Sequence, residues 1–194
     1  MGTSRSPGRA ELRRVDPVIF VTVGTQLPFD RLIRLVDAIA PDLPGRVFAQ
    51  TGNGKFQPAN MDWRSTLSPQ DFKRIMRSAR IVVGHAGIGT VLNARLLRKP
   101  MILFPRRAML GEHRNDHQLA TTRTLAGRPG IAIALNDADL RSLLLDPHKI
   151  GLPHHSNASS GEELKAALSE YLAKFPRRAR NPLLESRAQT EMTS

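Results

Sequence analysis

Short apolar runs alternate with helical patterns along most of the chain, and this alternation restricts the fold more than any other feature of the sequence. Residues 18–23 form a continuous, largely β-branched run that ends at Gly24 and is typical of a strand buried on both faces. Residues 29–40 then carry apolar side chains at helical spacing. Further strands are predicted over residues 46–51, 81–84, 101–104 and 131–135. Further helices are predicted over residues 69–78, 90–98, 113–126, 137–144 and 161–174.

Strands that alternate with helices form βαβ units, which build a parallel sheet with right-handed crossovers. We therefore predict an α/β fold with a single Rossmann-like domain over residues 17–175. Residues 1–16 are polar and rich in Gly, Ser, Pro and Arg, so we expect a disordered leader there. Residues 176–194 are expected to form a flexible basic tail.

The composition excludes several kinds of chemistry. The chain of 194 residues has no cysteine, so disulfides, thiolate metal sites and thiol catalysis are excluded. No stretch reaches the roughly 18 apolar residues of a spanning helix, and the first 16 residues lack the apolar core of a secretory signal. We expect a cytoplasmic protein.

The formal net charge of +12 favours an anionic partner, which is a phosphorylated ligand, a membrane surface or nucleic acid. Interleaved aromatic residues, on which the bases of a single strand would stack, are missing. A solvated basic surface explains the charge equally well.

Ligands of such sheets bind at the carboxyl ends of the strands, so the residues that follow strands are the candidates for a site. Gly24 and Thr25 follow the first strand. A glycine lets the backbone approach a ligand closely, and the amide at the start of the next helix favours an anion. A simple glycine turn with a helix cap is the alternative.

Residues 84–90, Gly-His-Ala-Gly-Ile-Gly-Thr, follow a predicted strand and open a helix. A glycine-rich turn before a helix N-terminus is the arrangement with which α/β proteins hold phosphates. His85 is expected to donate a hydrogen bond to a diphosphate oxygen, more strongly if protonated; a histidine satisfied by the backbone is the alternative. The spacing is GxxGxG rather than the GxGxxG of dinucleotide-binding proteins.

Two further groups lie on the same predicted edge of the sheet. Arg106 or Arg107 is expected to neutralise phosphate. The polar cluster of residues 112–118 supplies carboxylate, imidazole and amide groups that suit sugar hydroxyls. His113 and His117 have the spacing of a zinc helix but no third ligand, so no metal is expected.

Taken together, these residues resemble a known family. The residues that carry the resemblance are 81–90, Lys99, Pro100, 105–107, Glu112, His113 and 116–118. They are similar to the C-terminal donor-binding domain of family 28 glycosyltransferases, which include bacterial MurG. Residues 20–25 and 28–32 resemble a narrower group, the small catalytic subunits of two-part glycosyltransferases. Its branches are PssE-like exopolysaccharide glucuronosyltransferase subunits and the eukaryotic subunit that adds the second N-acetylglucosamine to the dolichol-linked precursor.

The resemblance implies one half of a GT-B enzyme, with the active site in a cleft between two Rossmann-like domains. The implied activity is a UDP-sugar-dependent hexosyltransferase that inverts the anomeric centre and needs no metal or other cofactor. The implied partner is a membrane-anchored subunit that binds a polyprenyl-diphosphate-linked glycan and supplies the general base. The donor half would then lie at the inner face of the membrane through this partner, and no nucleic acid is expected.

The resemblance also assigns roles to single residues. His85 stabilises the leaving diphosphate. The predicted nucleotide and diphosphate contacts are Gly24, Thr25, Ala86, Gly87, Gly89, Thr90, Asn93 and Arg106. The predicted donor-sugar contacts are Glu112, Asp116, His117 and Gln118. The family has a glutamate for the ribose hydroxyls where this chain has Asn93, which is an uncharged amide.

Two other classes remain as alternatives. One is a Rossmann-type oxidoreductase, although no GxGxxG motif or acidic residue follows the first strand. The other is a basic binding module without catalysis, whose affinity for nucleic acid would fall steeply with salt.

Overall fold

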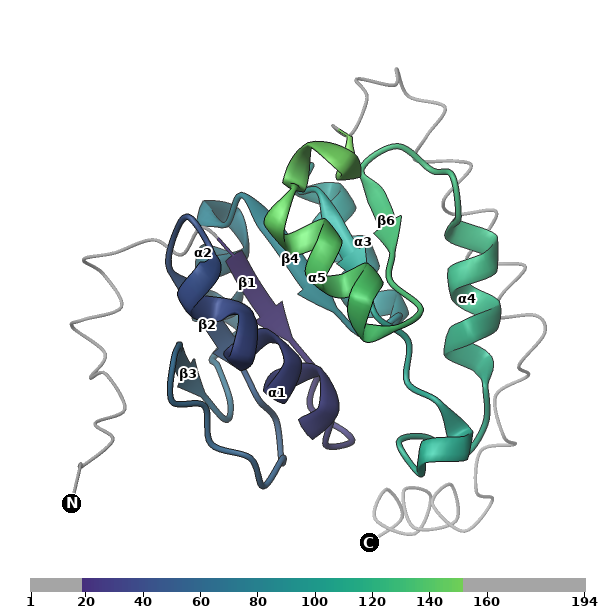
Figure 1. Ribbon diagram of the computed structural model, residues 1–194, viewed down its shortest axis with the longest axis horizontal. Coiled ribbons are helices and arrows are strands. Elements are labelled where there is room, and N and C mark those ends of the chain that lie inside the picture. Colours follow the sequence, from purple (N-terminus) through teal and green to yellow (C-terminus); the bar gives the residue numbers. More distant parts are fainter. Residues whose placement is uncertain (1–18, 152–194) are drawn as a thin grey trace, which may run out of the picture. The chain divides into compact units, whose positions relative to one another are not determined.

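The computed structural model describes residues 19–151, which form one six-stranded parallel sheet with helices on both faces (Figure 1). The strands are β1 (Ile19–Thr22), β2 (Val47–Gln50), β3 (Asp62–Arg64), β4 (Ile81–Gly84), β5 (Met101–Leu103) and β6 (Ile131–Ile133). The helices are α1 (Asp30–Ile39), α2 (Pro69–Ser78), α3 (Ile88–Leu96), α4 (His117–Leu125) and α5 (Asp137–Leu145). Short 3-10 turns lie at η2 (Ala40–Asp42), η3 (Ala108–Leu110) and η4 (Pro147–Ile150). The predicted α/β fold with a parallel sheet is confirmed.

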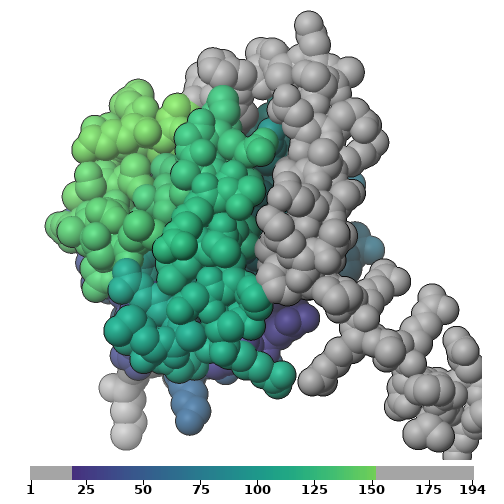
Figure 2. All heavy atoms as spheres, turned by 90° about the vertical axis from the view of Figure 1, so that its right-hand side faces the viewer, coloured from purple at the N-terminus to yellow at the C-terminus, as the bar shows by residue number. Residues whose placement is uncertain are grey.

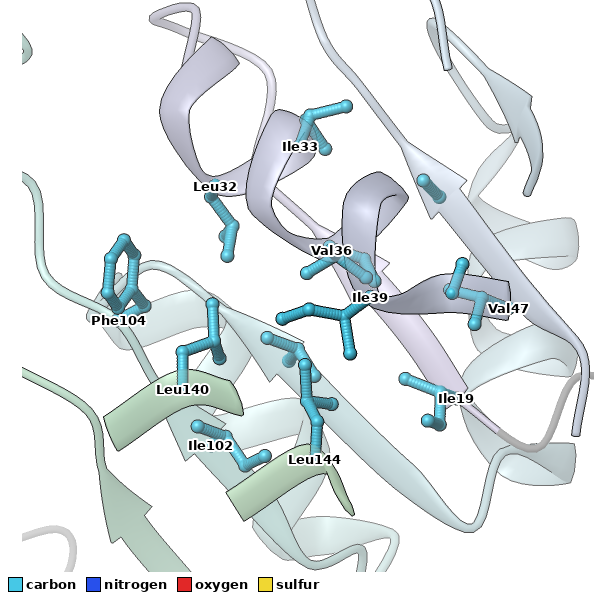
Figure 3. Packing of buried hydrophobic residues seen from close by; sticks show 14 of the residues in the cluster. Ile19, Leu32, Ile33, Val36, Ile39, Val47, Ile102, Phe104, Leu140 and Leu144 are labelled. Carbon is cyan, nitrogen blue, oxygen red and sulfur yellow. The ribbon is translucent and has the colours of Figure 1, made fainter. Parts of the chain in front are cut away.

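Each face of the sheet has its own hydrophobic core, because successive side chains of a strand point to opposite faces. On one face α1 and α5 cover the sheet, and Figure 3 shows Leu32 and Val36 of α1 near Leu140 and Leu144 of α5, over the strands. The other face is covered by α2, α3 and α4, and Phe20 of β1 is fully buried in its core. Both cores consist mainly of aliphatic side chains, with a few phenylalanines in each.

The polar start of α2 follows the prediction. Pro69 is its first residue, and the Ser68 side chain accepts a hydrogen bond of 3.1 Å from the Asp71 amide. Two other helices begin elsewhere than predicted. Helix α3 begins at Ile88 rather than at Thr90, and α4 begins at His117, four residues after the predicted start.

Strand β3 was not predicted. It has only three residues, all half-buried, and it pairs with β2 at the edge of the sheet. Its sequence, Asp-Trp-Arg, has no apolar run that marks a strand. An ion pair between Arg46 and Asp62 holds this edge, and backbone amides of Ala59 and Asn60 donate to the buried Asp37 carboxylate.

Several predictions concern segments outside the described residues. They are the leader over residues 1–16, the helix over residues 161–174 and the basic tail over residues 176–194. Within residues 19–151, no helix is long and apolar enough to cross a membrane.

The strand order β3–β2–β1–β4–β5–β6 places a switch point between β1 and β4. From β1 the chain runs outward to β2, and from β4 it runs outward in the other direction to β5. The loops after β1 and β4 therefore diverge and leave a crevice at the carboxyl ends of these strands, where such sheets bind ligands.

Candidate functional site

A cavity of about 660 Å³ lies at this switch point. Its walls are the loop after β1, the turn between β4 and α3, the first turns of α2 and α3, and side chains from the segment after β5. The predicted site residues that line it are Gly24, Thr25, His85, Gly87, Gly89, Thr90, Asn93, Arg106 and Gln118. The structure thus brings together nine residues from four separate segments.

The first turn of α3 faces this cavity. Gly87 is the N-cap, and the amides of Thr90 and Val91 both donate to its carbonyl at 3.1 Å. The amides in the first turn of a helix have no carbonyl four residues earlier within the helix to which they could donate. The amides of Ile88 and Gly89 belong to this turn. Such amides, together with the helix dipole, make an anion-binding position.

The imidazole of His85 is held between two glycines. A Cβ atom added at Gly87 would lie 2.1 Å from Nε2 of His85, and one added at Gly24 would lie 2.9 Å from Cε1. Both distances are shorter than real contacts, so the ring occupies the space that side chains would need at these positions. Gly24 also has a φ of +76°, which favours glycine.

The environment of His85 keeps its imidazole neutral. Burial lowers the pKa of His85 to about 4, and the nearby Arg106 guanidinium acts in the same direction, against a smaller effect of the Thr22 backbone. The Nδ1 atom is buried and has no hydrogen-bond partner of acceptable geometry among the described residues. Without a ligand, His85 therefore offers the cavity a neutral imidazole and not the charged donor that would bind phosphate more strongly.

Arg106 borders the cavity but is 2% exposed, and its guanidinium contacts protein carbonyls. Nη2 donates to the carbonyls of Val23 at 2.9 Å and Leu27 at 2.7 Å, and Nη1 donates to that of Pro28. The guanidinium also stacks on Phe29 at 4.7 Å from the ring centroid. Arg106 thereby fixes the loop after β1, and its predicted contact with phosphate stays a prediction.

Burial lowers the pKa of Arg106 to about 10, an effect that the Glu112 carboxylate opposes. The side chain therefore stays charged at neutral pH.

Three of the four predicted sugar-binding residues do not line the cavity. Both carboxylate oxygens of Glu112 accept from Arg31, at 2.6 and 2.9 Å. The Asp116 carboxylate accepts from the Ala108 amide at 2.9 Å. His117 is the first residue of α4 and is half-buried. The contacts of Glu112 and Asp116 order the segment between β5 and α4, which forms part of the face seen in Figure 2.

Gln118 is the member of this group that reaches the cavity. Its side chain is 9% exposed, and its Oε1 accepts from the Arg106 amide at 3.0 Å. Ala86 is 3% exposed and does not line the cavity, so its predicted contact with a ligand would be through its backbone.

Sequence reasoning missed one wall of the cavity. Leu67, Pro69, Phe72 and Lys73, at the start of α2, all line it. The candidate residues were those that follow predicted strands, and β3, which precedes α2, was not among these strands. The polar cap at Ser68 marked a helix start at this edge of the sheet and was the available signal.

Within residues 19–151, no cluster of three or more His, Asp or Glu side chains has the arrangement of a metal site.

The sequence profile described as the glycosyltransferase family 28 C-terminal domain matches residues 18–174. No curated protein matches the chain in sequence.

Solved structures share the fold. The NMR structure of ALG13 aligns with a TM-score of 0.51 at 17% identity, over 77% of this chain and 94% of ALG13. A kitacinnamycin glycotransferase aligns with a TM-score of 0.53 at 16% identity, over 86% of this chain and 41% of that protein. The glycosyltransferase SsfS6 of Streptomyces sp. SF2575, complexed with thymidine diphosphate, aligns with a TM-score of 0.50 at 20% identity, over 84% of this chain and 39% of that protein. The chain spans about two fifths of the length of the last two proteins.

Proposed function

The chain belongs to the family of the glycosyltransferase family 28 C-terminal domain, and from this premise we propose that it is the donor-binding catalytic subunit of a two-part inverting glycosyltransferase. The observation that carries the proposal is the cavity at the switch point, where the amides of the first turn of α3 and the imidazole of His85 lie together. The proposed donor is a UDP-sugar, of the glucuronic acid or N-acetylglucosamine class.

The proposed reaction transfers the sugar in one displacement. An acceptor hydroxyl oxygen attacks the anomeric carbon, the bond from this carbon to the diphosphate oxygen breaks, and UDP leaves with the electron pair. The acceptor proton passes to a general base, which we assign to the partner subunit. This chain has the task of holding the leaving group in place.

The charge that develops on the diphosphate needs donors that are already in position. We propose that the amides from Gly87 to Thr90 and the loop of Gly24 and Thr25 supply them. A neutral imidazole still has one N–H to donate, so His85 contributes a hydrogen bond rather than a charge. Arg106, held by carbonyls behind this loop, adds a positive field at the leaving group.

A partner is part of the proposal because the described residues form one Rossmann-like sheet, whereas the resemblance implies an active site in a cleft between two such domains. Met109 and Leu110 in η3 are 83% and 52% exposed, in the segment that follows β5 at the cavity edge of the sheet. Exposed apolar side chains of this kind suit a protein contact. We propose that the partner is membrane-anchored, carries a lipid-linked glycan for exopolysaccharide or capsule synthesis, and holds this chain at the cytoplasmic face.

Binding of UDP to the purified chain is the first test. A ligand-observed NMR titration with UDP is expected to saturate, and NAD serves as the control nucleotide. Saturable binding of NAD in place of UDP would favour the oxidoreductase alternative and contradict the proposal.

A test of the proposed role of His85 needs the complete enzyme, with the acceptor subunit present. In the complex with the acceptor subunit, His85→Ala is expected to lower kcat by roughly 100-fold, the usual effect of removing one donor to a developing charge. His148→Ala, an exposed histidine of η4 away from the cavity lining, is the matched control. Unchanged turnover of His85→Ala would remove the residue from the mechanism.

A further inference from the structure

The walls of the cavity contain no carboxylate among the residues that the structure describes. Lys73 and Arg106 bring positive charge, and His85 and His113 bring imidazoles. Carboxylates are the groups with which sheets of this type hold the hydroxyls of a ribose. Their absence bears on which nucleotides the site accepts.

Asn93 lies on α3 at the position where the hydroxyls of a ribose would be bound. It lies three residues beyond Thr90, and at 1.5 Å per residue this is about 4.5 Å further along the helix. If a diphosphate sits at the first turn, the sugar attached to it falls beside Asn93. Leu67 and Phe72 also line the cavity and offer an apolar surface for a base.

The contacts of Asn93 limit what it offers. Its Nδ2 donates to the Gly89 carbonyl of the preceding turn at 2.8 Å. The Oδ1 acceptor and the second Nδ2 hydrogen are left for hydroxyls, and both are uncharged. A neutral hydrogen bond contributes less than one to a charged group, and a carboxylate would also accept from two hydroxyls at once.

The end of β2 is the other place where a doubly wound sheet carries an acidic residue for ribose. Here that residue is Gln50, which is 3% exposed and accepts from the Thr22 hydroxyl at 2.9 Å. It is therefore an amide as well, and it is engaged within the sheet.

We infer that the site reads the 2′-hydroxyl weakly and accepts both ribonucleoside and 2′-deoxyribonucleoside diphosphates as carriers of the donor sugar. This inference rests on the proposed function, since it places a nucleoside diphosphate in the cavity. It assigns Asn93 as the residue that allows both kinds of nucleotide to bind.

The experiment compares UDP with 2′-deoxy-UDP, which differ in one hydroxyl, by isothermal titration calorimetry on the full chain. For the wild-type chain, the Kd for 2′-deoxy-UDP is expected to exceed that for UDP by less than about tenfold, the range of one neutral hydrogen bond. In Asn93→Glu the ratio is expected to rise to about 10- to 100-fold, as for a charged acceptor. Asn93→Gln is the uncharged control and should keep the wild-type ratio. The side chain is exposed, so all three proteins should fold.

The outcomes separate the two proposals. A wild-type ratio above about tenfold is more than one neutral hydrogen bond supplies and would overturn the inference while leaving the proposed function intact. An unchanged ratio in Asn93→Glu would overturn the placement of Asn93 beside the ribose. Failure of both nucleotides to bind would count against the proposed function and, with it, the inference.

Discussion

Two basic side chains, His85 and Arg106, lie close together at the cavity, and both have lowered pKa values. Burial is the main cause for each, and the charge of Arg106 acts further on His85. The imidazole loses its charge at neutral pH because its ordinary pKa of 6.5 is already close to neutral. The guanidinium keeps its charge because its lowered pKa of about 10 is still well above neutral. A ligand that enters this cavity therefore meets the fixed positive charge of Arg106 close to the neutral imidazole of His85.

The lowered pKa of His85 makes stability depend on pH. Between pH 6.5 and about 4 the unfolded chain binds a proton that the folded chain does not, so the free energy of unfolding falls as the pH is lowered through this range. The loss attributable to His85 is at most about 3 kcal/mol. Urea unfolding at pH 7, 6, 5 and 4.5 measures it, and His85→Asn should show a shallower loss by this amount. Parallel curves for the two proteins would argue against a neutral His85.

Arg106 should matter more for stability than an arginine at a binding surface. Arg106→Lys keeps the charge but cannot reach the carbonyls of Val23, Leu27 and Pro28 together, because an ammonium lacks the planar fork. We expect a cost of about 2 to 4 kcal/mol. Chemical denaturation measures it, with Arg107→Lys as the neighbouring control. A loss below about 0.5 kcal/mol would mean that water replaces these contacts.

The sugar-binding roles predicted for Glu112 and Asp116 show what the sequence does not reveal at this scale. A cluster of polar residues after a strand marks the correct edge of the sheet. It does not reveal that Arg31, 81 residues earlier, pairs with Glu112, or that Asp116 receives an amide of its own loop. Partners so distant in sequence follow from the packing of the strands and not from local pattern.

Among the secondary-structure elements, α3 concentrates the chemistry of the site in one turn. Its start, Gly-Ile-Gly, has low helix propensity, which is why the sequence predicted a later start. The two glycines differ in kind. A Cβ at Gly87 would collide with His85, whereas a Cβ at Gly89 meets nothing within 4 Å.

This difference gives a paired prediction for α3. Gly89→Ala should raise the free energy of unfolding by about 0.5 to 1 kcal/mol, since alanine favours the helix. Gly87→Ala must displace the imidazole and should weaken UDP binding by at least about tenfold, the equivalent of one lost hydrogen bond. Thermal unfolding and the UDP titration measure the two effects. Equal affinities of wild type and Gly87→Ala would contradict the placement of the diphosphate at this turn.

The elements that sequence predicts well are those in which a local pattern decides the structure. Strands β1 and β4 are buried on both faces, so their apolar runs are continuous, and α2 begins at a cap and a proline. Strand β3 exists because β2 offers it an edge, and its three half-buried residues carry no such pattern. The wall of the cavity that α2 supplies was missed for the same reason.

At the scale of the whole molecule, the described part of the chain is a single sheet whose site lies open at one edge. The larger solved enzymes of the same fold are more than twice as long as the aligned portion. In the proposed complex the partner would close the cavity from outside, so donor binding and sugar transfer are separable properties. In that complex, donor binding would belong to this chain, and transfer would need both subunits.

Donor binding should therefore stabilise the isolated chain. A ligand that binds the folded state alone, at 100 times its Kd, raises the free energy of unfolding by about 2.7 kcal/mol. We expect this gain for UDP in chemical denaturation of the wild-type chain and a smaller one for Gly87→Ala at the same UDP concentration. An equal gain in both proteins would indicate that UDP binds elsewhere.

The contacts of Arg106 also have a consequence for how the chain folds during its synthesis on the ribosome. Its guanidinium closes the loop after β1 by bonds to Val23 and Leu27, which precede it by 83 and 79 residues. A nascent chain that has emerged only as far as α3 contains the glycines and His85 but not Arg106, the residue that secures the loop. If the proposed nucleotide binds at this loop, it would stabilise only chains whose synthesis has passed β5, and it would therefore assist folding late and not early.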